Sequence, residues 1–156
     1  MHKYFIIISI LISFMISSGS NVIKIEANGT FMPSGSPTKG PARTDLGTCC
    51  IIEIKQPYKI NGALSGSLEI DYRILIYGPC GKPPGTYDEE WIAYGSFDGI
   101  VNGISRTGKF RYTANVKAGG DVEGTIVFGK GINGELNVKG NFNDGKLLYN
   151  GWLNEN

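Results

Sequence analysis

Apolar and polar residues alternate one by one along most of this chain. Between Val22 and Phe31, apolar Ile23, Ile25 and Ala27 fall on one side of the alternation and polar residues on the other. Because successive side chains of a strand point to opposite faces, this pattern predicts a strand with one buried face. The pattern recurs in eight segments, at about 22–31, 48–55, 64–77, 90–98, 109–116, 121–129, 135–142 and 146–153.

The sequence between these segments is typical of turns. Glycine supplies 23 of the 156 residues, and its spread among β-branched and aromatic residues indicates tight turns and bulges. No stretch keeps a 3.6-residue apolar stripe, so we expect no helix in the mature chain. Such strands can close as a two-sheet sandwich or as a barrel. The even strand count and the short connections after residue 100 favour an all-β fold, an antiparallel up-and-down barrel of about eight strands.

Residues 1–20 have the pattern of a secretory signal peptide. His2 and Lys3 precede an apolar run from Phe5 to Ile16, and small polar residues follow. The run is too short for a typical membrane span, and an uncleaved anchor is the alternative. We therefore expect a secreted protein, extracellular or periplasmic, with residues 21–156 as a single barrel domain. The Pro-, Gly- and Ser-rich segment 32–47 is expected to be one long loop.

Charge and histidine content exclude several function classes. Removing Lys3 with the signal peptide reduces the 15 basic residues to 14, against 14 acidic residues. A neutral chain with no basic run predicts neither a nucleic acid nor a membrane surface as partner after signal cleavage. His2 is the only histidine, so the mature chain has no imidazole for a catalytic relay or a zinc site. We expect no metal and no cofactor.

Glycine and aromatic residues recur at fixed spacing in the second half of the chain. They are Gly95, Phe97, Gly99, Gly103, Gly108 and Phe110, followed by Gly134-Glu135-Leu136 and Gly140-Asn141-Phe142. Upstream stand Ser65-Gly66-Ser67-Leu68-Glu69 and Gly29-Thr30-Phe31. This run resembles a bacterial domain family of unknown function with the allene oxide cyclase barrel-like fold. Segment 32–47 and the insert around Cys80 depart from the family pattern.

The resemblance implies an eight-stranded antiparallel barrel with an apolar interior. The plant cyclases with this fold rearrange an unstable fatty-acid epoxide in an apolar cavity without a cofactor. A fold hosts many activities, however, and no catalytic residue of those enzymes can be placed on this chain.

Six aromatic residues on apolar strand faces are candidates for lining a ligand cavity. Small barrels can hold one ligand, and their interiors are also commonly filled by their own side chains, so both interpretations stay open. The six are Tyr72, Trp91, Phe97, Phe110, Tyr112 and Phe128.

Three consecutive acids, Asp88, Glu89 and Glu90, precede Trp91 at the start of a predicted strand. A carboxylate at the rim of a dry pocket can act as a general acid or base, which makes Glu89 and Glu90 candidates. Ordinary solvated charges are the alternative. A shared calcium ion is disfavoured, because consecutive strand residues point in alternate directions.

Export predicts one disulfide among the three cysteines. Cys50 shares parity with Ile52 and Ile54 and should face the interior, whereas Cys49 should face outward. We expect a Cys49–Cys80 disulfide with Cys50 as a buried thiol, and a Cys50–Cys80 bond is the open alternative.

These patterns support two hypotheses of function. The first is a secreted barrel that binds a small apolar molecule and isomerises or cyclises it without a cofactor. The second is a non-catalytic exported domain whose loops, 32–47 and 77–87, bind a partner or the cell surface. Asn28, in the sequon Asn28-Gly29-Thr30, is a candidate N-glycosylation site if the host glycosylates exported proteins.

Overall fold

The computed structural model describes residues 22–155. The predicted signal peptide, residues 1–20, lies outside the described residues. Within residues 22–155 the chain forms antiparallel strands and a single 3-10 turn. In this part of the chain we find no helix with the length and apolar character needed to cross a membrane.

Nine strands follow one another within residues 22–155, and eight of them correspond to the predicted segments. The 3-10 turn η1 (Phe142–Asp144) lies between the last two strands. The strands are β1 (Ile23–Pro33), β2 (Lys39–Asp45), β3 (Cys50–Gly62), β4 (Leu64–Ile76), β5 (Glu89–Val101), β6 (Ile104–Val116), β7 (Asp121–Lys130), β8 (Ile132–Asn141) and β9 (Leu147–Glu155).

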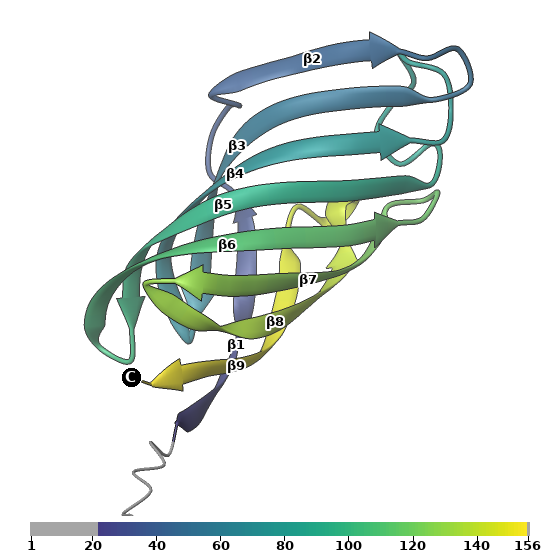
Figure 1. Ribbon diagram of the computed structural model, residues 1–156. Coiled ribbons are helices and arrows are strands. Elements are labelled where there is room, and N and C mark those ends of the chain that lie inside the picture. Colours follow the sequence, from purple (N-terminus) through teal and green to yellow (C-terminus); the bar gives the residue numbers. More distant parts are fainter. Residues whose placement is uncertain (1–21, 156) are drawn as a thin grey trace, which may run out of the picture.

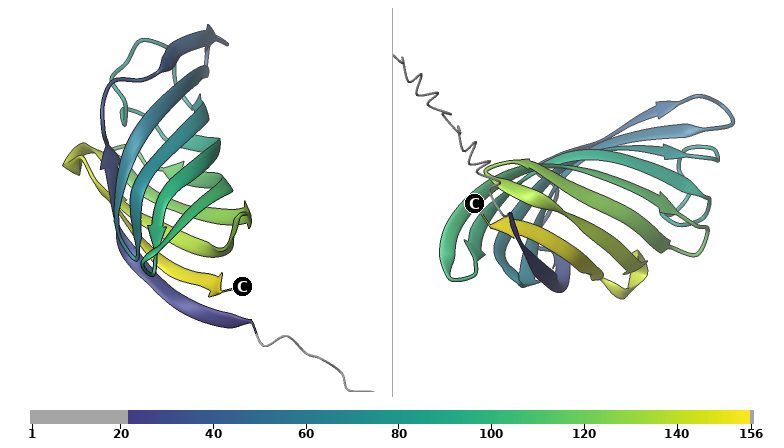
Figure 2. Two further views of the ribbon diagram at one scale, coloured as in Figure 1. Left: turned by 90° about the vertical axis from the view of Figure 1, so that its left-hand side faces the viewer. Right: turned by 60° about the horizontal axis from the view of Figure 1, so that its bottom comes forward.

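Eight of these strands close into a ring, and β2 is an additional strand beside it. The sheet order is β1-β9-β8-β7-β6-β5-β4-β3-β2, and β1 also pairs with β3, which brings Phe31 opposite Ile60. Figure 1 and Figure 2 show β2 at the outer end of the sheet, above the ring. The prediction of an antiparallel up-and-down barrel of about eight strands is confirmed.

The expectation that residues 32–47 form one long loop is wrong, because strand β2 lies within this segment. β1 pairs with β3 only at residues 58–62, so the edge of β3 at residues 50–55 remains open, and β2 pairs there. All seven residues of β2 are exposed. Because neither face of β2 is buried, apolar and polar residues do not alternate along it, and the sequence pattern could not predict the strand. Pro41 is tolerated because β2 is an edge strand.

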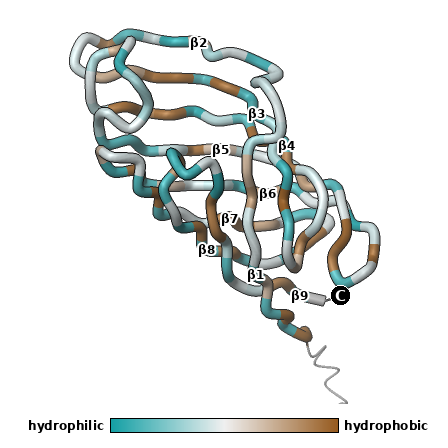
Figure 3. The backbone as a smooth tube through the Cα atoms, turned by 180° about the vertical axis from the view of Figure 1, so that it is seen from behind, coloured by the Kyte–Doolittle hydropathy of each residue, from teal (hydrophilic) through white to brown (hydrophobic). Residues whose placement is uncertain are grey.

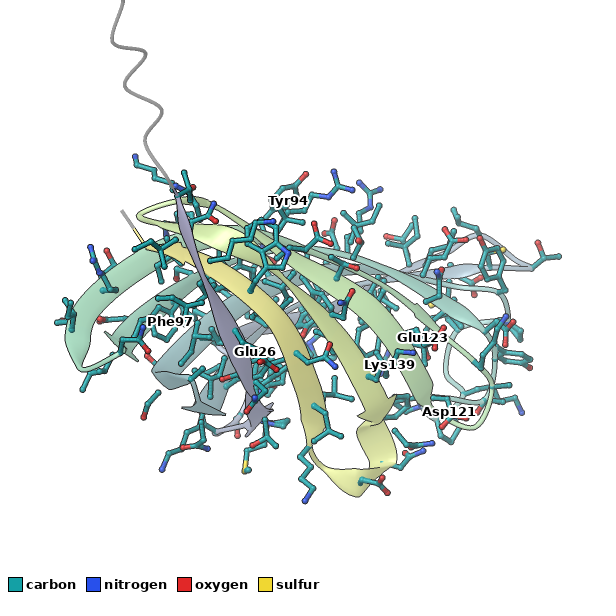
Figure 4. All side chains as sticks on the ribbon, turned by 90° about the horizontal axis from the view of Figure 1, so that it is seen from below. Glu26, Tyr94, Phe97, Asp121, Glu123 and Lys139 are labelled. Atoms are coloured by element: carbon teal, nitrogen blue, oxygen red, sulfur yellow. A yellow bond between two sulfur atoms is a disulfide. The ribbon has the colours of Figure 1, made fainter. Side chains whose placement is uncertain are left out.

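Inward-facing side chains fill the closed part of the barrel. Phe97 is buried inside, whereas Tyr94 is exposed on the outer face (Figure 4). Gly95 has a packing role here: it pairs with Phe110 on β6, and a Cβ atom at Gly95 would collide with the Phe110 ring. Absence of a side chain at Gly95 therefore lets the Phe110 ring lie against the backbone of β5.

Candidate ligand-binding pocket

An apolar cavity opens at the end of the barrel where β3 extends beyond its pairing with β1 and continues beside β4. Its volume is about 320 Å³, and residues from β1 to β5, from the connection between β4 and β5, and from η1 line it. We call it the mouth pocket. Its position explains why the closed part of the barrel can be packed while one end remains hollow.

Four isoleucines form one wall of the mouth pocket: Ile52, Ile54, Ile74 and Ile76. They are the inward-facing residues of β3 and β4, and the register places Ile52 opposite Ile74. Figure 3 shows hydrophobic stretches along β3 and β4 beside the largely hydrophilic β2. In the described part of the chain, the four side chains remain partly exposed.

Aromatic rings form the floor. Tyr58, Trp91 and Phe142 line the mouth pocket. The Trp91 ring centroid lies 6.2 Å from that of Phe142 and 5.5 Å from that of Tyr72, which lies below. The Tyr72 hydroxyl donates a hydrogen bond to the Tyr58 hydroxyl over 3.1 Å. Burial raises the pKa of Tyr58 and raises that of Tyr72 well above its ordinary value, so both phenols stay protonated at neutral pH.

The two predicted rim acids lie on opposite faces of β5. Glu89 lines the mouth pocket with only 4% of its surface exposed. Its carboxylate accepts hydrogen bonds from Trp91 Nε1 over 2.7 Å and from the Gly85 backbone N–H over 3.1 Å. Glu90 points outward and accepts a hydrogen bond from the Tyr77 hydroxyl. Only Glu89 is therefore positioned to meet a molecule in the pocket.

Asp88, the third acid of the run, holds a neighbouring loop in place. Its carboxylate accepts hydrogen bonds from the Ala118 backbone N–H over 2.9 Å and from Lys117 Nζ over 3.0 Å. The backbone hydrogen bond and then Lys117 lower the pKa of Asp88. Among residues 22–155 no group of three metal-binding side chains could hold an ion, so the three acids have three separate roles.

The predicted Cys49–Cys80 disulfide is wrong, because Cys80 bonds to Cys50. Cys50, the first residue of β3, faces the barrel interior as its parity predicts, and its Cα atom lies 5.0 Å from that of Cys80. The connection between β4 and β5 contributes Lys82 and Pro84 to the pocket lining, on the same side of β3 as the inward-facing Cys50 to which Cys80 bonds. Cys49 faces away from the barrel interior and is a free thiol.

Of the six aromatic candidates, only Trp91 lines the mouth pocket directly. Tyr72 and Tyr112 pack beneath it, with ring centroids 6.1 Å apart. Phe97, Phe110 and Phe128 are buried elsewhere in the barrel. The ring centroids of Phe110 and Phe128 lie 5.3 Å apart.

Sequence reasoning missed Tyr58 and Phe142. Tyr58 follows Pro57, beyond the end predicted for its strand, and Phe142 belongs to a turn. The Gly140-Asn141-Phe142 motif contained Phe142, but nothing in the motif indicated a pocket.

Both loop segments of the second hypothesis contribute to the pocket as well. Pro41 and Arg43 from β2, and Lys82 and Pro84 from the connection between β4 and β5, lie around its opening. Arg43 and Lys82 are exposed to solvent. Asn28, the glycosylation candidate, is exposed on β1.

Comparisons with protein families, with curated proteins and with solved structures found no match to this chain. The resemblance to the allene oxide cyclase-like family therefore stays a prediction from the sequence motifs.

Proposed function

We propose that this protein is exported and binds a small, largely apolar molecule in the mouth pocket. The observation that carries the proposal is a cavity of about 320 Å³ with an isoleucine wall and an aromatic floor at one end of a packed barrel. Ligand pockets usually measure roughly 300–1,000 Å³ and are mostly apolar with a few polar groups. Covering the partly exposed isoleucines would stabilise the complex by about 25 cal/mol for each Å² of apolar surface buried.

The disulfide supports the exported part of the proposal. Disulfides persist in oxidising compartments and are rare in reducing ones. The Cys50–Cys80 bond ties the connection that carries Lys82 and Pro84 to the first residue of β3, beside the pocket. An oxidising environment would therefore also keep the opening of the pocket in shape.

Filling the pocket with a larger side chain tests the proposal. Ile74→Trp should weaken binding of apolar compounds by at least about tenfold, because the indole would occupy the ligand's space. Ile92→Trp is the matched control, since Ile92 lies on the outer face of the neighbouring strand and is 52% exposed. The readout is native mass spectrometry and calorimetry against a panel of lipids and terpenoids. Equal binding by the two variants, or no binding by the unmodified protein, would contradict the proposal.

Cofactor-free isomerisation or cyclisation of the bound molecule is a second candidate function. The observation that favours it is the Glu89 carboxylate, which lies in an apolar pocket that the Tyr58 phenol also lines. A positioned carboxylate can take up and return a proton, and a shaped pocket can hold one reactive conformer.

Turnover would appear as a product of unchanged mass with a changed chromatographic retention time. The Glu89→Gln variant should form no product even at ligand concentrations high enough to fill its pocket, while Glu90→Gln should behave like the unmodified protein. A product formed equally fast by the Glu89→Gln variant would exclude the carboxylate from the reaction.

A further inference from the structure

The Glu89 carboxylate is buried in the mouth pocket, and no basic side chain among residues 22–155 forms an ion pair with it. Among residues 22–155, the basic side chains that form ion pairs do so with Glu69, Asp88 and Glu123. Glu89 has only neutral donors, the Trp91 indole N–H and the Gly85 backbone N–H. Buried charges in proteins are usually paired, because removing an unpaired carboxylate from water is costly.

The two neutral donors leave room for a third. Each carboxylate oxygen has two lone pairs, and here each oxygen accepts one hydrogen bond. One lone pair on each oxygen is therefore available to a donor in the pocket. A donor that also carries positive charge would satisfy both the hydrogen-bonding capacity and the uncompensated charge of Glu89.

The surroundings of Glu89 also favour a cation. Trp91, Tyr58 and Phe142 line the same pocket, and the Trp91 indole lies directly beside the carboxylate because its N–H bonds to Oε2. Aromatic rings attract ammonium groups, most strongly where water is excluded. The isoleucine wall beyond them offers a surface for the hydrocarbon part of the same molecule.

Arg43 and Lys82 would attract an anionic ligand, whereas Glu89 would attract a cationic one. The exposure of the two basic side chains decides which attraction is stronger. Both side chains lie at the opening in contact with solvent. Water and salt weaken the attraction between an exposed charge and a ligand, whereas a buried carboxylate is screened much less. The charge buried deepest in the pocket should therefore dominate the selection.

We propose that the molecule bound in the mouth pocket is an apolar amine. Its ammonium group pairs with Glu89 beside the aromatic rings, and its hydrocarbon part lies against Ile52 and Ile74. This assignment rests on the proposed function, because it names the ligand class of the same pocket. The inference needs no covalent chemistry and applies whether or not the bound molecule is converted.

Three probes with one ring system and different polar groups test the assignment. They are 1-naphthylmethylamine, 1-naphthylmethanol and 1-naphthoic acid, titrated by calorimetry at pH 7 into the full mature protein with its disulfide intact. The amine should bind about tenfold or more tightly than the alcohol, in keeping with a charge-assisted hydrogen bond, and the acid should bind most weakly. This comparison uses only the unmodified protein and so does not depend on a variant that folds.

Two variants test whether the preference for the amine comes from Glu89. Glu89→Gln should bring the affinity for the amine down to that for the alcohol and leave the alcohol nearly unaffected. Glu90→Gln, its outward-facing neighbour, should preserve the preference for the amine. Alcohol or acid binding as tightly as the amine would overturn the inference and leave the proposed function standing. Absence of binding by all three probes would overturn both.

Discussion

At the residue scale, two buried polar groups differ in whether they form hydrogen bonds. The Glu89 carboxylate accepts two hydrogen bonds, whereas the Tyr112 hydroxyl has no partner among residues 22–155. Tyr112 is fully buried, and its ring packs edge-on against Phe31, Tyr72 and Trp91. The ring therefore contributes packing, while the buried hydroxyl carries a desolvation cost with no compensating bond.

Removing the Tyr112 hydroxyl should not destabilise the barrel. We expect Tyr112→Phe to leave the free energy of unfolding unchanged or to raise it by up to about 1 kcal/mol, because the ring contacts remain. Tyr72→Phe is the comparison: it removes the hydrogen bond to Tyr58 and should lower the free energy of unfolding by about 1 kcal/mol. Urea unfolding measures both. A larger loss for Tyr112→Phe than for Tyr72→Phe would show that the Tyr112 hydroxyl is bonded after all.

At the scale of elements, strands with one buried face were predictable and the exposed strand was not. Alternation places Ile52 and Ile54 on the interior face of β3, as the structure does. β2 was missed because both of its faces contact solvent, so no selection for alternation acts on it. The parity of Cys50 was predicted correctly, but the side toward which the Cys80 segment folds depends on tertiary contacts. Alternation also places Glu89 and Glu90 on opposite faces of β5. It could not reveal that this end of the barrel holds a cavity.

The Cys50–Cys80 disulfide should stabilise the barrel by restricting its unfolded chain. The bond spans 30 residues, which corresponds to roughly 3 to 4 kcal/mol in the chain-entropy treatment. Replacing both cysteines with serine should lower the free energy of unfolding by about that amount and loosen the opening of the pocket. Chemical denaturation with and without ligand measures both effects.

Cys49→Ser is the matched control, because Cys49 is a free thiol on the other side of the chain. It should change the free energy of unfolding by less than about 0.5 kcal/mol. A large loss of stability for Cys49→Ser, or none for the double variant, would contradict the assignment of the bond.

At the scale of the whole molecule, tyrosines from three strands share one packed interior. Tyr72 on β4, Tyr112 on β6 and Tyr149 on β9 are all buried. Burial raises the pKa of Tyr149 and raises those of Tyr72 and Tyr112 well above their ordinary value of 10.0. The folded barrel therefore holds these three protons at pH values where the unfolded chain releases them.

This linkage predicts alkaline unfolding. Below about pH 10 the phenols are protonated in both states, so their contribution to stability is fully present. As the pH rises above this value, only the unfolded state loses these protons, and the free energy of unfolding should fall. Phenolate absorbance from the buried tyrosines should appear together with loss of the folded circular dichroism signal. Ionisation of all tyrosines while the barrel remains folded would contradict the packed interior.

We propose that the mouth pocket binds a small apolar molecule, and isoleucine methyl groups report directly on this claim. Ile52, Ile54, Ile74 and Ile76 line the pocket, whereas Ile92, Ile100 and Ile104 are exposed elsewhere. The measurement is a titration of 1-naphthylmethylamine into methyl-labelled protein followed by NMR. We expect saturable shifts at the four pocket isoleucines and almost none at the three exposed ones. Shifts confined to the exposed isoleucines, or no saturable shift at all, would contradict the claim.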